Sequence, residues 1–339
     1  MIYPALRGPL FCLDPERAHA FTLSALRVLG RVAPGARTRA NPGPLESAPV
    51  SAMGLSFSNR VGIAAGFDKN GTAVDGLLAL GFGHVEVGTV TPKPQAGNPQ
   101  PRVFRLVAAN ALINRMGFPN DGAERVVARL KARTRKGVVG VNIGKNAVTP
   151  LERAVDDYVA CFRAVASVAD YVTVNVSSPN TAGLRTLQQT DQLRPLLAAV
   201  LDEARAYEVS SGRRVPILLK VSPDVSDEGL QEIGGVALSL PVAGIIATNT
   251  TLARDAVQGQ LHAQETGGLS GLPLVRRSRE AVRLLRGVVG PQFCIVGVGG
   301  VSSVEDARLL REAGADLVQV YTALVYRGPG LVRELADAR

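Results

Sequence analysis

Eight short apolar runs recur along the sequence between residues 61 and 323, separated by polar or helix-length stretches. The runs are rich in β-branched residues and nearly continuous in apolar character, as strands buried on both faces of a sheet are. The stretches between them, such as "SVEDARLLREAG" from residue 303, have the amphipathic pattern of helices. Eight strand–helix units predict an α/β fold, a TIM (β/α)8 barrel, in preference to an open doubly wound sheet. The runs are "VGIAAG" at 61, "HVEVGTV" at 84, "VVGVNIG" at 138, "YVTVNVSS" at 171, "PILLKVSP" at 216, "GIIATNT" at 244, "CIVGVGG" at 294 and "LVQVYTA" at 317.

The first 40 residues form a separate unit. In "LDPERAHAFTLSALRVLGR", Asp14 is placed to cap a helix that Pro15 begins, and "MIYPALRGPLF" precedes it as a shorter apolar segment. The following "APGARTRANPGP" is typical of a linker. We therefore expect a two-helix extension in residues 1–40 and a barrel in residues 41–339. Such helices can serve as a lid, a dimer contact or a membrane-surface foot, or can simply pack on the barrel.

The amino-acid composition limits the kinds of ligand and macromolecule that we expect this protein to bind. Lys and Arg number 38 against 29 Asp and Glu, and the net charge of +9 suits an anionic substrate, a phosphate cofactor or an anionic membrane. No basic run is interleaved with aromatic residues, so nucleic acid is not expected. Three cysteines and three histidines are too scattered for a disulfide framework or a zinc site, which predicts no metal and a reducing cytoplasmic compartment. We expect neither a transmembrane span nor a signal peptide.

Polar groups gather where the predicted strands end, which is where TIM barrels carry their functional residues. They are amides, hydroxyls and ammonium groups, without the carboxylate or histidine clusters of a glycosidase, a metal centre or a Ser-His-Asp triad. This lining suits a planar, hydrogen-bonding anion, with the chemistry supplied by a cofactor. The residues are Lys69, Thr89, Asn142, Asn175, Lys220, Thr248, Asn249, Thr250, Gly299, Gly300, Tyr321 and Thr322.

Two features indicate what that cofactor is. The glycines of "GVGG", after the seventh run, either let backbone N–H groups approach a phosphate or serve only a tight turn. The basic residues are nearly all arginine and only six are lysine, so a lysine at a strand end stands out. One of the six, Lys220, points into the predicted barrel mouth. There it would meet the negative charge of a reduced flavin, or form a Schiff base as in aldolases.

Two loops belong to the predicted site. Residues 91–137 are too long for a simple connection; "PRVFRLVAANALINRMGF" predicts a hairpin that turns at residues 108–110, and "NDGAE" predicts the start of a helix. The segment "VNVSSPNTAGL", from residue 174, places serines at a strand end. The residues alone leave open whether Ser178 is a catalytic base or a cap of the turn before Pro179.

The motifs "AAGFDKNG", "INRMGFPN", "GVNIGKN", "NVSSPNT", "IATNTT", "TGGLSG" and "VGVGG" occur in this order. Together they resemble the dihydroorotate dehydrogenases, specifically the class 2, quinone-dependent branch. The match runs from about residue 50 to the end, and "LDPERAH" resembles that branch as well. The resemblance implies a flavoprotein with FMN that oxidises (S)-dihydroorotate to orotate in pyrimidine (UMP) biosynthesis.

The resemblance also implies residue roles. The FMN phosphate would lie at Gly271, Gly299, Gly300, Tyr321 and Thr322. The isoalloxazine would be held by Ala64, Ala65, Gly66, Phe67, Asp68, Lys69, Thr89, Asn142, Asn175, Lys220 and Thr248. The substrate would be bound by Lys69, Asn114, Arg115, Met116, Gly117, Phe118, Asn175, Asn180, Asn249 and Thr250.

By the same resemblance, Ser178 takes a proton from C5 while a hydride leaves C6 for flavin N5. The class 1 branch uses a cysteine there, and none occurs between Cys161 and Cys294. A serine hydroxyl is a weak base, so we expect a relay through Thr181 and a water. The N-terminal extension would form an apolar tunnel for a membrane quinone, with His19 and Arg105 as contacts. We expect a monomer, held peripherally at the cytoplasmic face of the cell membrane.

Three other readings compete with this one. A class 1 enzyme would use fumarate, or NAD through an iron–sulfur partner; Ser178 and the extension argue against it. A phosphate-sugar lyase would work through Lys220 and would be colourless. A non-catalytic membrane-surface protein would leave the polar strand ends unexplained.

Overall fold

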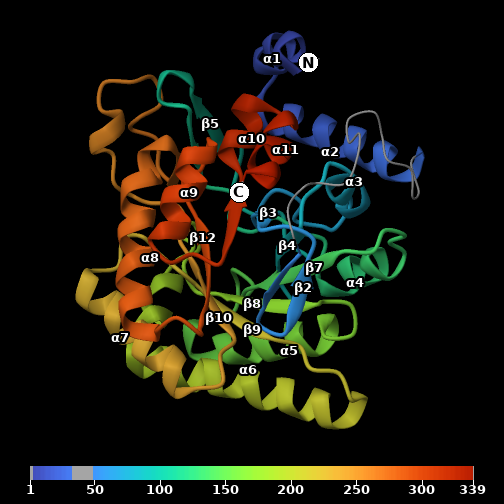
Figure 1. Ribbon diagram of the computed structural model, residues 1–339, viewed down its shortest axis with the longest axis vertical. Coiled ribbons are helices and arrows are strands. Elements are labelled where there is room, and N and C mark those ends of the chain that lie inside the picture. Colours follow the sequence, from blue (N-terminus) through green and yellow to red (C-terminus); the bar gives the residue numbers. More distant parts are fainter. Residues whose placement is uncertain (1–2, 33–48, 339) are drawn as a thin grey trace.

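The computed structural model describes residues 3–32 and 49–338, and its centre is a closed parallel barrel of eight strands (Figure 1). All eight predicted strands are present, and their spatial order follows the chain, with the last strand pairing with the first. The TIM-barrel prediction is therefore confirmed. The strands are β3 (Val61–Ile63), β4 (His84–Val90), β7 (Val138–Ile143), β8 (Tyr171–Asn175), β9 (Ile217–Val221), β10 (Gly244–Ala247), β12 (Cys294–Val298) and β13 (Leu317–Val320).

Helices surround this barrel. They are α3 (Val74–Ala79), α4 (Ala123–Lys131), α5 (Ala154–Val165), α6 (Thr190–Ser211), α7 (Asp227–Ser239), α8 (Val275–Val289), α9 (Val304–Glu312), α10 (Thr322–Arg327) and α11 (Gly330–Asp337). The helix predicted from "NDGAE" is α4, which begins after Gly122. The predicted linker and the expected boundary between residues 40 and 41 lie outside the described residues.

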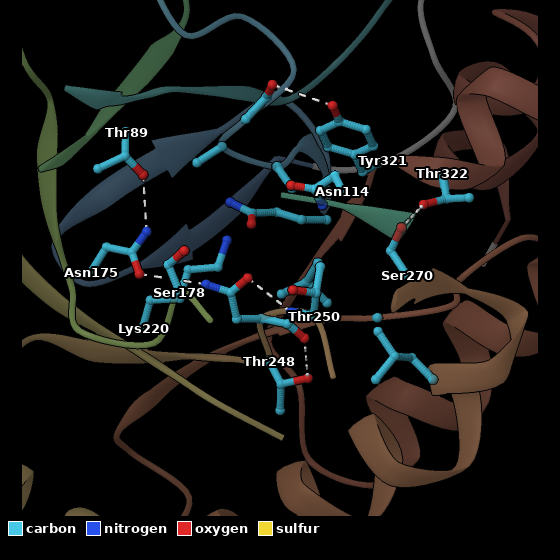
Figure 2. A pocket seen from close by; sticks show the side chains of 18 of the residues that line it. Thr89, Asn114, Asn175, Ser178, Lys220, Thr248, Thr250, Ser270, Tyr321 and Thr322 are labelled. Atoms are coloured by element: carbon cyan, nitrogen blue, oxygen red, sulfur yellow. Dashed lines mark hydrogen bonds between the residues drawn. The ribbon is translucent and has the colours of Figure 1, made fainter. Parts of the chain in front are cut away.

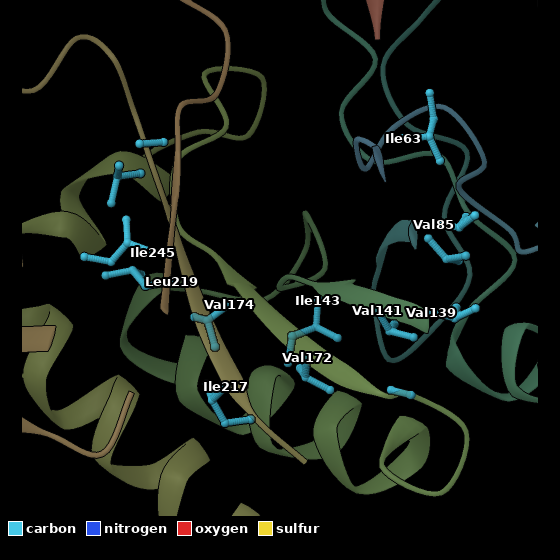
Figure 3. Close-up of a cluster of buried hydrophobic side chains, with 14 of the residues drawn as sticks. Ile63, Val85, Val139, Val141, Ile143, Val172, Val174, Ile217, Leu219 and Ile245 are labelled. Carbon is cyan, nitrogen blue, oxygen red and sulfur yellow. The ribbon is translucent and has the colours of Figure 1, made fainter. Parts of the chain in front are cut away.

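Alternate residues of each strand face opposite sides, and the outward set forms the main hydrophobic core (Figure 3). Val139, Val141 and Ile143 on β7, and Val172 and Val174 on β8, are fully buried in this core. The helices cover this apolar face, so both faces of the parallel sheet are shielded from water. The outward residues thus account for the continuous apolar pattern of the runs.

The inward residues at the amino-terminal end of the barrel form a second core. A short hairpin of β1 (Val50–Ala52) and β2 (Leu55–Phe57) packs there, and Phe57 is fully buried among inward side chains such as Tyr171 and Leu218. The sequence did not lead us to expect this hairpin. It closes the end of the barrel opposite to the polar strand ends.

A three-stranded antiparallel sheet lies outside the barrel. The predicted hairpin is confirmed as β5 (Val103–Leu106) and β6 (Ala111–Asn114), joined by a 3-10 turn, η1 (Val107–Ala109), and by Asn110 in the left-handed conformation at φ 46°. The third strand, β11 (Gly268–Gly271), pairs with β6 and was not expected as a strand. This pairing fixes the long insertion against the segment that precedes α8.

The N-terminal extension consists of α1 (Tyr3–Cys12) and α2 (Pro15–Val32), as predicted (Figure 1). Asp14 caps α2, because its Oδ1 accepts the backbone N–H groups of Glu16 and Arg17 at 3.0 Å each. Helix α1 lies against α10, where the Tyr3 hydroxyl donates to the carbonyl of Val325. The first helix of the described chain therefore packs against a helix that follows the last barrel strand.

The close approach of β7 to an aromatic ring makes a stability prediction. A Cβ added at Gly140 would lie 2.1 Å from Tyr171 Cζ, whereas Gly235, on α7, has nothing within 4 Å. We expect Gly140→Ala to destabilise the fold by about 1–3 kcal/mol through overpacking. Gly235→Ala, the matched control, should stabilise it by up to about 1 kcal/mol through helix propensity. Urea unfolding midpoints measure both; equal midpoints for the two variants would contradict the packing argument.

Candidate active site

A pocket opens at the carboxyl-terminal ends of the barrel strands, and side chains from β4, β8, β9 and the loop after β13 converge on it (Figure 2). Most of the predicted site residues line it. They are Ala64, Ala65, Gly66, Lys69, Thr89, Asn114, Met116, Gly117, Phe118, Asn175, Ser178, Asn180, Lys220, Thr248, Asn249, Thr250, Gly271, Gly299, Gly300, Tyr321 and Thr322.

A chain of amides and hydroxyls forms one wall. Asn175 Nδ2 donates to Thr89 Oγ1 at 2.9 Å and to Asn142 Oδ1 at 3.0 Å, and Thr89 Oγ1 donates to Asn142 Oδ1 at 2.6 Å. On the other side of the same amide, Asn175 Oδ1 accepts the backbone N–H of Ser177 at 3.2 Å and its hydroxyl at 3.0 Å. Asn249 Nδ2 then donates to Ser177 Oγ at 2.9 Å. The wall therefore presents fixed donors and acceptors.

Ser178 both caps a turn and faces the pocket. Its Oγ accepts the backbone N–H of Asn180 at 3.2 Å, which is the turn-capping role considered above. Its side chain also lines the pocket while only 4% exposed. Asn180 Nδ2 in turn donates to Asn114 Oδ1 at 3.1 Å, so the loop is tied to the end of β6. Because the cap uses an oxygen lone pair, the hydroxyl hydrogen stays available to another group.

Two lysine ammonium groups give the pocket positive charge. Lys69 Nζ donates to the carbonyl of Gly66 at 2.6 Å, and burial lowers the pKa of Lys69 to about 8 although nearby Glu16 acts to raise it. Burial also lowers the pKa of Lys220, while Glu86 raises it. Within the described residues, Lys220 has no hydrogen-bond acceptor. Two partly desolvated cations in one pocket favour an anionic ligand.

The loops after β12 and β13 form a cradle of backbone donors. Within the described part of the chain, the N–H groups of Gly299, Gly300, Tyr321 and Thr322 donate to no protein acceptor. At Gly300, where φ is +79°, an added Cβ would lie 2.7 Å from the backbone nitrogen of Val275, so no larger side chain fits without displacement. Four backbone amides without a protein acceptor, on residues that line one pocket, suit a phosphate group.

Four of the residues predicted to bind flavin or substrate lie outside the lining of this pocket. Asp68 is buried and accepts the backbone N–H groups of Thr72 and Ala73, at 2.9 and 2.7 Å, just before α3. Asn142 lies one layer deeper, behind Thr89 and Asn175. The remaining two, Phe67 and Arg115, contact other groups.

Arg115 forms an ion pair with Glu265 at 2.6 Å and stacks over the ring of Phe104 at 4.6 Å. Its side chain therefore holds β6 against the segment before β11. Phe67 is 2% exposed and lines a second cavity.

This second cavity lies between the N-terminal helices and the barrel, and its lining is mostly apolar. His19 stacks edge-on against Phe67 at 5.0 Å, and burial lowers the pKa of His19 to about 4, so the imidazole is neutral at pH 7. Arg105 also lines the cavity, but its guanidinium donates to the carbonyl of Leu13 at 2.8 Å, just beyond the end of α1. Tyr321 lines both cavities, which therefore share a wall.

Sequence reasoning missed polar residues inside the barrel. Glu86 and Gln319 are fully buried, and Gln319 lines the pocket. Both lie within runs that we had interpreted as apolar. Gln319 lies two residues before Tyr321, and Thr173 lies two residues before Asn175. Alternate residues of a strand face the same side, so counting two residues back from each strand-end residue would have identified these inward-facing positions.

Residues 3–32 and 49–338 contain neither a candidate metal centre nor a candidate membrane span. This part of the chain has no group of three or more His, Cys, Asp or Glu side chains arranged to hold a metal ion. None of its helices combines the length and the apolar character needed to cross a bilayer.

Comparisons with known proteins agree with this architecture. Residues 47–338 match the family described as dihydroorotate dehydrogenase. The dihydroorotate dehydrogenase (quinone) of Burkholderia ambifaria is 51% identical over 337 residues, covering 99% of this chain and 97% of the relative. That of Burkholderia pseudomallei is also 51% identical, covering 99% and 98%.

Solved structures give the same result. The dihydroorotate dehydrogenase of Eimeria tenella in complex with ferulenol superposes with a TM-score of 0.87 at 40% identity, over 96% of this chain and 90% of that one. Its ligand-free form gives a TM-score of 0.85 at 40% identity, over 96% and 94%. The chain therefore belongs to the dihydroorotate dehydrogenase family, in its class 2, quinone-dependent branch, and is an oxidoreductase.

Proposed function

We propose that this protein oxidises (S)-dihydroorotate to orotate with FMN as its resident flavin, and that a membrane quinone reoxidises the flavin. One observation carries the proposal: the Ser178 hydroxyl, the asparagine amides and the Lys69 ammonium line the same pocket as four free backbone amides and Lys220. The pocket thus combines a base (Ser178), amides that can recognise a ring, a cation for an anionic group (Lys69) and backbone donors for a phosphate. The names of the quinone-dependent relatives support the same assignment.

The residues present fit FMN. The backbone amides at Gly299, Gly300, Tyr321 and Thr322 would hold its phosphate, and the Thr322 hydroxyl is already held by Ser270 at 2.8 Å. Lys220 would meet negative charge on the ring system, which would compensate the cost of burying an ammonium. When bound, FMN supplies the hydride acceptor that no side chain of the chain can provide.

The pyrimidine substrate would be held by charge and by directional hydrogen bonds. Lys69 would pair with the carboxylate, and the amides of Asn114, Asn175, Asn180 and Asn249 would meet ring carbonyl and N–H groups. The Asn114 and Asn180 side chains already bond to each other at 3.1 Å, so they act as one unit. A pyrimidine with alternating donors and acceptors is discriminated by such fixed amides.

Ser178 would accept the proton from C5 while a hydride leaves C6. The Asn180 N–H donates to Ser178 Oγ and would stabilise negative charge there, which makes it easier for the hydroxyl to give up its own hydrogen as the proton from C5 arrives. Thr181, 8% exposed on the same loop, would pass that hydrogen on through a water. The capping and catalytic roles of Ser178 are therefore compatible.

The N-terminal extension would admit the quinone. Its apolar cavity shares Tyr321 with the active-site pocket, and His19 and Arg105 would contact the quinone head group. Large apolar side chains are exposed on or next to α1 and α2, at Leu6, Leu13, Phe21, Val28 and Val32. These would seat the protein peripherally on the cytoplasmic face of the cell membrane. The division at residues 40 and 41 and the monomeric state remain predictions.

A flavin spectrum tests the proposed function first. We expect the purified protein to show flavin absorption bands that bleach on anaerobic addition of dihydroorotate and return with a soluble quinone, because both reactions pass through the bound flavin. Fumarate or NAD should not restore them. A colourless protein that cannot be loaded with FMN, and that borohydride traps on Lys220, would favour the lyase reading instead.

Ser178→Ala separates the base from the turn cap. Removing the hydroxyl should leave FMN and orotate binding within about threefold of the unmodified protein and lower turnover by about 10²–10⁴-fold. Stopped-flow flavin reduction and orotate titration measure the two effects. If orotate affinity fell in parallel with turnover, the cap at Asn180 would be the main role of Ser178.

Lys69 makes orotate binding depend on pH. Its pKa of about 8 means that the ammonium is present below that pH and is lost as the pH rises through it. The orotate dissociation constant should therefore rise above about pH 8, by up to about tenfold per pH unit, when titrated between pH 6 and 9.5. Lys69→Arg keeps its charge throughout and is the matched control. A profile as steep in that variant would assign the dependence to another group.

A further inference from the structure

The barrel interior beneath the pocket contains a carboxylate that no role described above uses. Glu86, on β4, is fully buried and accepts three hydrogen bonds: from Asn142 Nδ2 at 2.9 Å, Gln319 Nε2 at 2.9 Å and the Tyr171 hydroxyl at 3.1 Å. Its donors come from β7, β8 and β13, so it joins strands on several sides of the barrel. Burying a carboxylate is costly unless its hydrogen bonds are made, and here they are.

The chemistry of a carboxylate sets the direction of the bonds above it. An ionised carboxylate can only accept, so the atom that Asn142 turns toward Glu86 must be its NH2 group. The Asn142 oxygen then faces the pocket side, where it accepts from Thr89 and Asn175. This forces Asn175 to present its own NH2 group to Asn142.

The hydrogen-bond direction set at Asn142 also determines how Asn175, Ser177 and Asn249 bond to one another. With its NH2 group used, Asn175 turns its oxygen toward Ser177, whose backbone N–H can only donate. Ser177 Oγ donates to that oxygen and accepts from Asn249. Glu86, at one end of this series of hydrogen bonds, thus fixes the donor and acceptor directions of two pocket-lining amides, Asn175 and Asn249, and of Ser177.

Charge supports the same assignment. Glu86 acts on Lys220 as a counter-charge, and Lys220 is the cation of this layer. Burial lowers the pKa of the neighbouring His84 to about 3, so that imidazole is neutral at pH 7. Lys220 therefore places a positive charge near the carboxylate, and the three groups that contact the carboxylate oxygens all donate to them.

We propose that Glu86 is a positioning residue, a buried acceptor that fixes the direction in which the amides of Asn142 and Asn175 face the active site. It touches neither substrate nor flavin and acts through these two asparagines. The inference rests on the proposed function, since its consequence is the recognition of a pyrimidine ring by correctly oriented amides. A reversed Asn175 would exchange the donor and acceptor positions that it presents to the pocket.

Three variants test the proposal, each purified with its flavin. Glu86→Met keeps the side-chain length but removes every acceptor, which leaves Asn142 free to reverse. We expect the orotate dissociation constant and the KM for dihydroorotate to rise about tenfold or more. Glu86→Gln restores one acceptor oxygen, and Gln319 can turn to offer its own oxygen, which has no partner. Orotate affinity should then recover to within about threefold of the unmodified protein.

The matched control is Thr173→Val. Thr173 is fully buried on the inward side of β8, and its hydroxyl has no hydrogen-bond partner. Removing this hydroxyl should leave orotate affinity unchanged, which shows that lost polarity in the barrel core is not itself the cause. If Glu86→Met does not fold, Glu86→Ala replaces it, because water can then fill the space. Water donates as readily as it accepts, so the direction is still lost.

The outcomes separate the possibilities. Loss of orotate affinity in the Met or Ala variant with recovery in the Gln variant supports the positioning role. A folded Met or Ala variant with unchanged affinity and only a lower unfolding midpoint would overturn it in favour of a purely structural role. Equal losses in the Met and Gln variants would overturn amide direction and assign the effect to charge. If the unmodified protein does not bind orotate, the proposed function fails, and this inference falls with it.

Discussion

The parallel pairing of β13 with β3 is the contact on which the site depends. Val318 pairs with Val61 and Val320 with Ile63, and this register closes the barrel. Closure brings the loop after the first strand beside the loop after the last, where the Tyr321 hydroxyl donates to the carbonyl of Gly66 at 3.3 Å. In an open sheet these loops would lie at opposite edges. The cradle of backbone donors after β12 and β13 and the Lys69 segment face one pocket because the eight strands form a ring.

The N-terminal extension is coupled to that pocket by charge. Glu16, in the first turn of α2, pairs with Arg102 at 2.6 Å, and the Arg102 side chain is only 9% exposed. The same carboxylate raises the pKa of Lys69, against the larger effect of burial. A largely buried ion pair is sensitive to the loss of either partner, and only the Glu16 side is partly exposed. The extension is therefore part of the electrostatic environment of the active site, and it also encloses the second cavity.

The sequence predicted the features that depend on local pattern. The barrel strands were recognisable because burial on both faces makes them continuously apolar, and Asp14 was recognisable as a cap because the capping bond is local. The strand-end residues followed from the barrel rule alone. The expectation of FMN and the proposed role of Ser178 as a base came from family resemblance, since the residues alone left a base and a turn cap equally possible.

Features that depend on tertiary contacts were not predictable in this way. Strand β11 is four residues of "GLSG" whose extended form comes from pairing with β6, and β1 and β2 are three residues each. The contact of Arg105 with the carbonyl of Leu13 depends on where α1 packs. Glu86 was overlooked because the outward valines of β4 make the whole run apolar on average.

The hairpin at the amino-terminal end has a consequence for hydration. Phe57 and its neighbours pack at the amino-terminal end of the barrel, whereas Gln319, which donates to Glu86, lines the pocket at the opposite rim, so the polar layer around Glu86 meets water at that rim. A ligand bound at that rim would cover this layer and slow the exchange of water with it. The buried amides would then be expected to exchange their protons with deuterated solvent quickly in the empty protein and slowly once the rim is filled. The directions of the buried amides around Glu86 are thus fixed before a ligand binds at the rim.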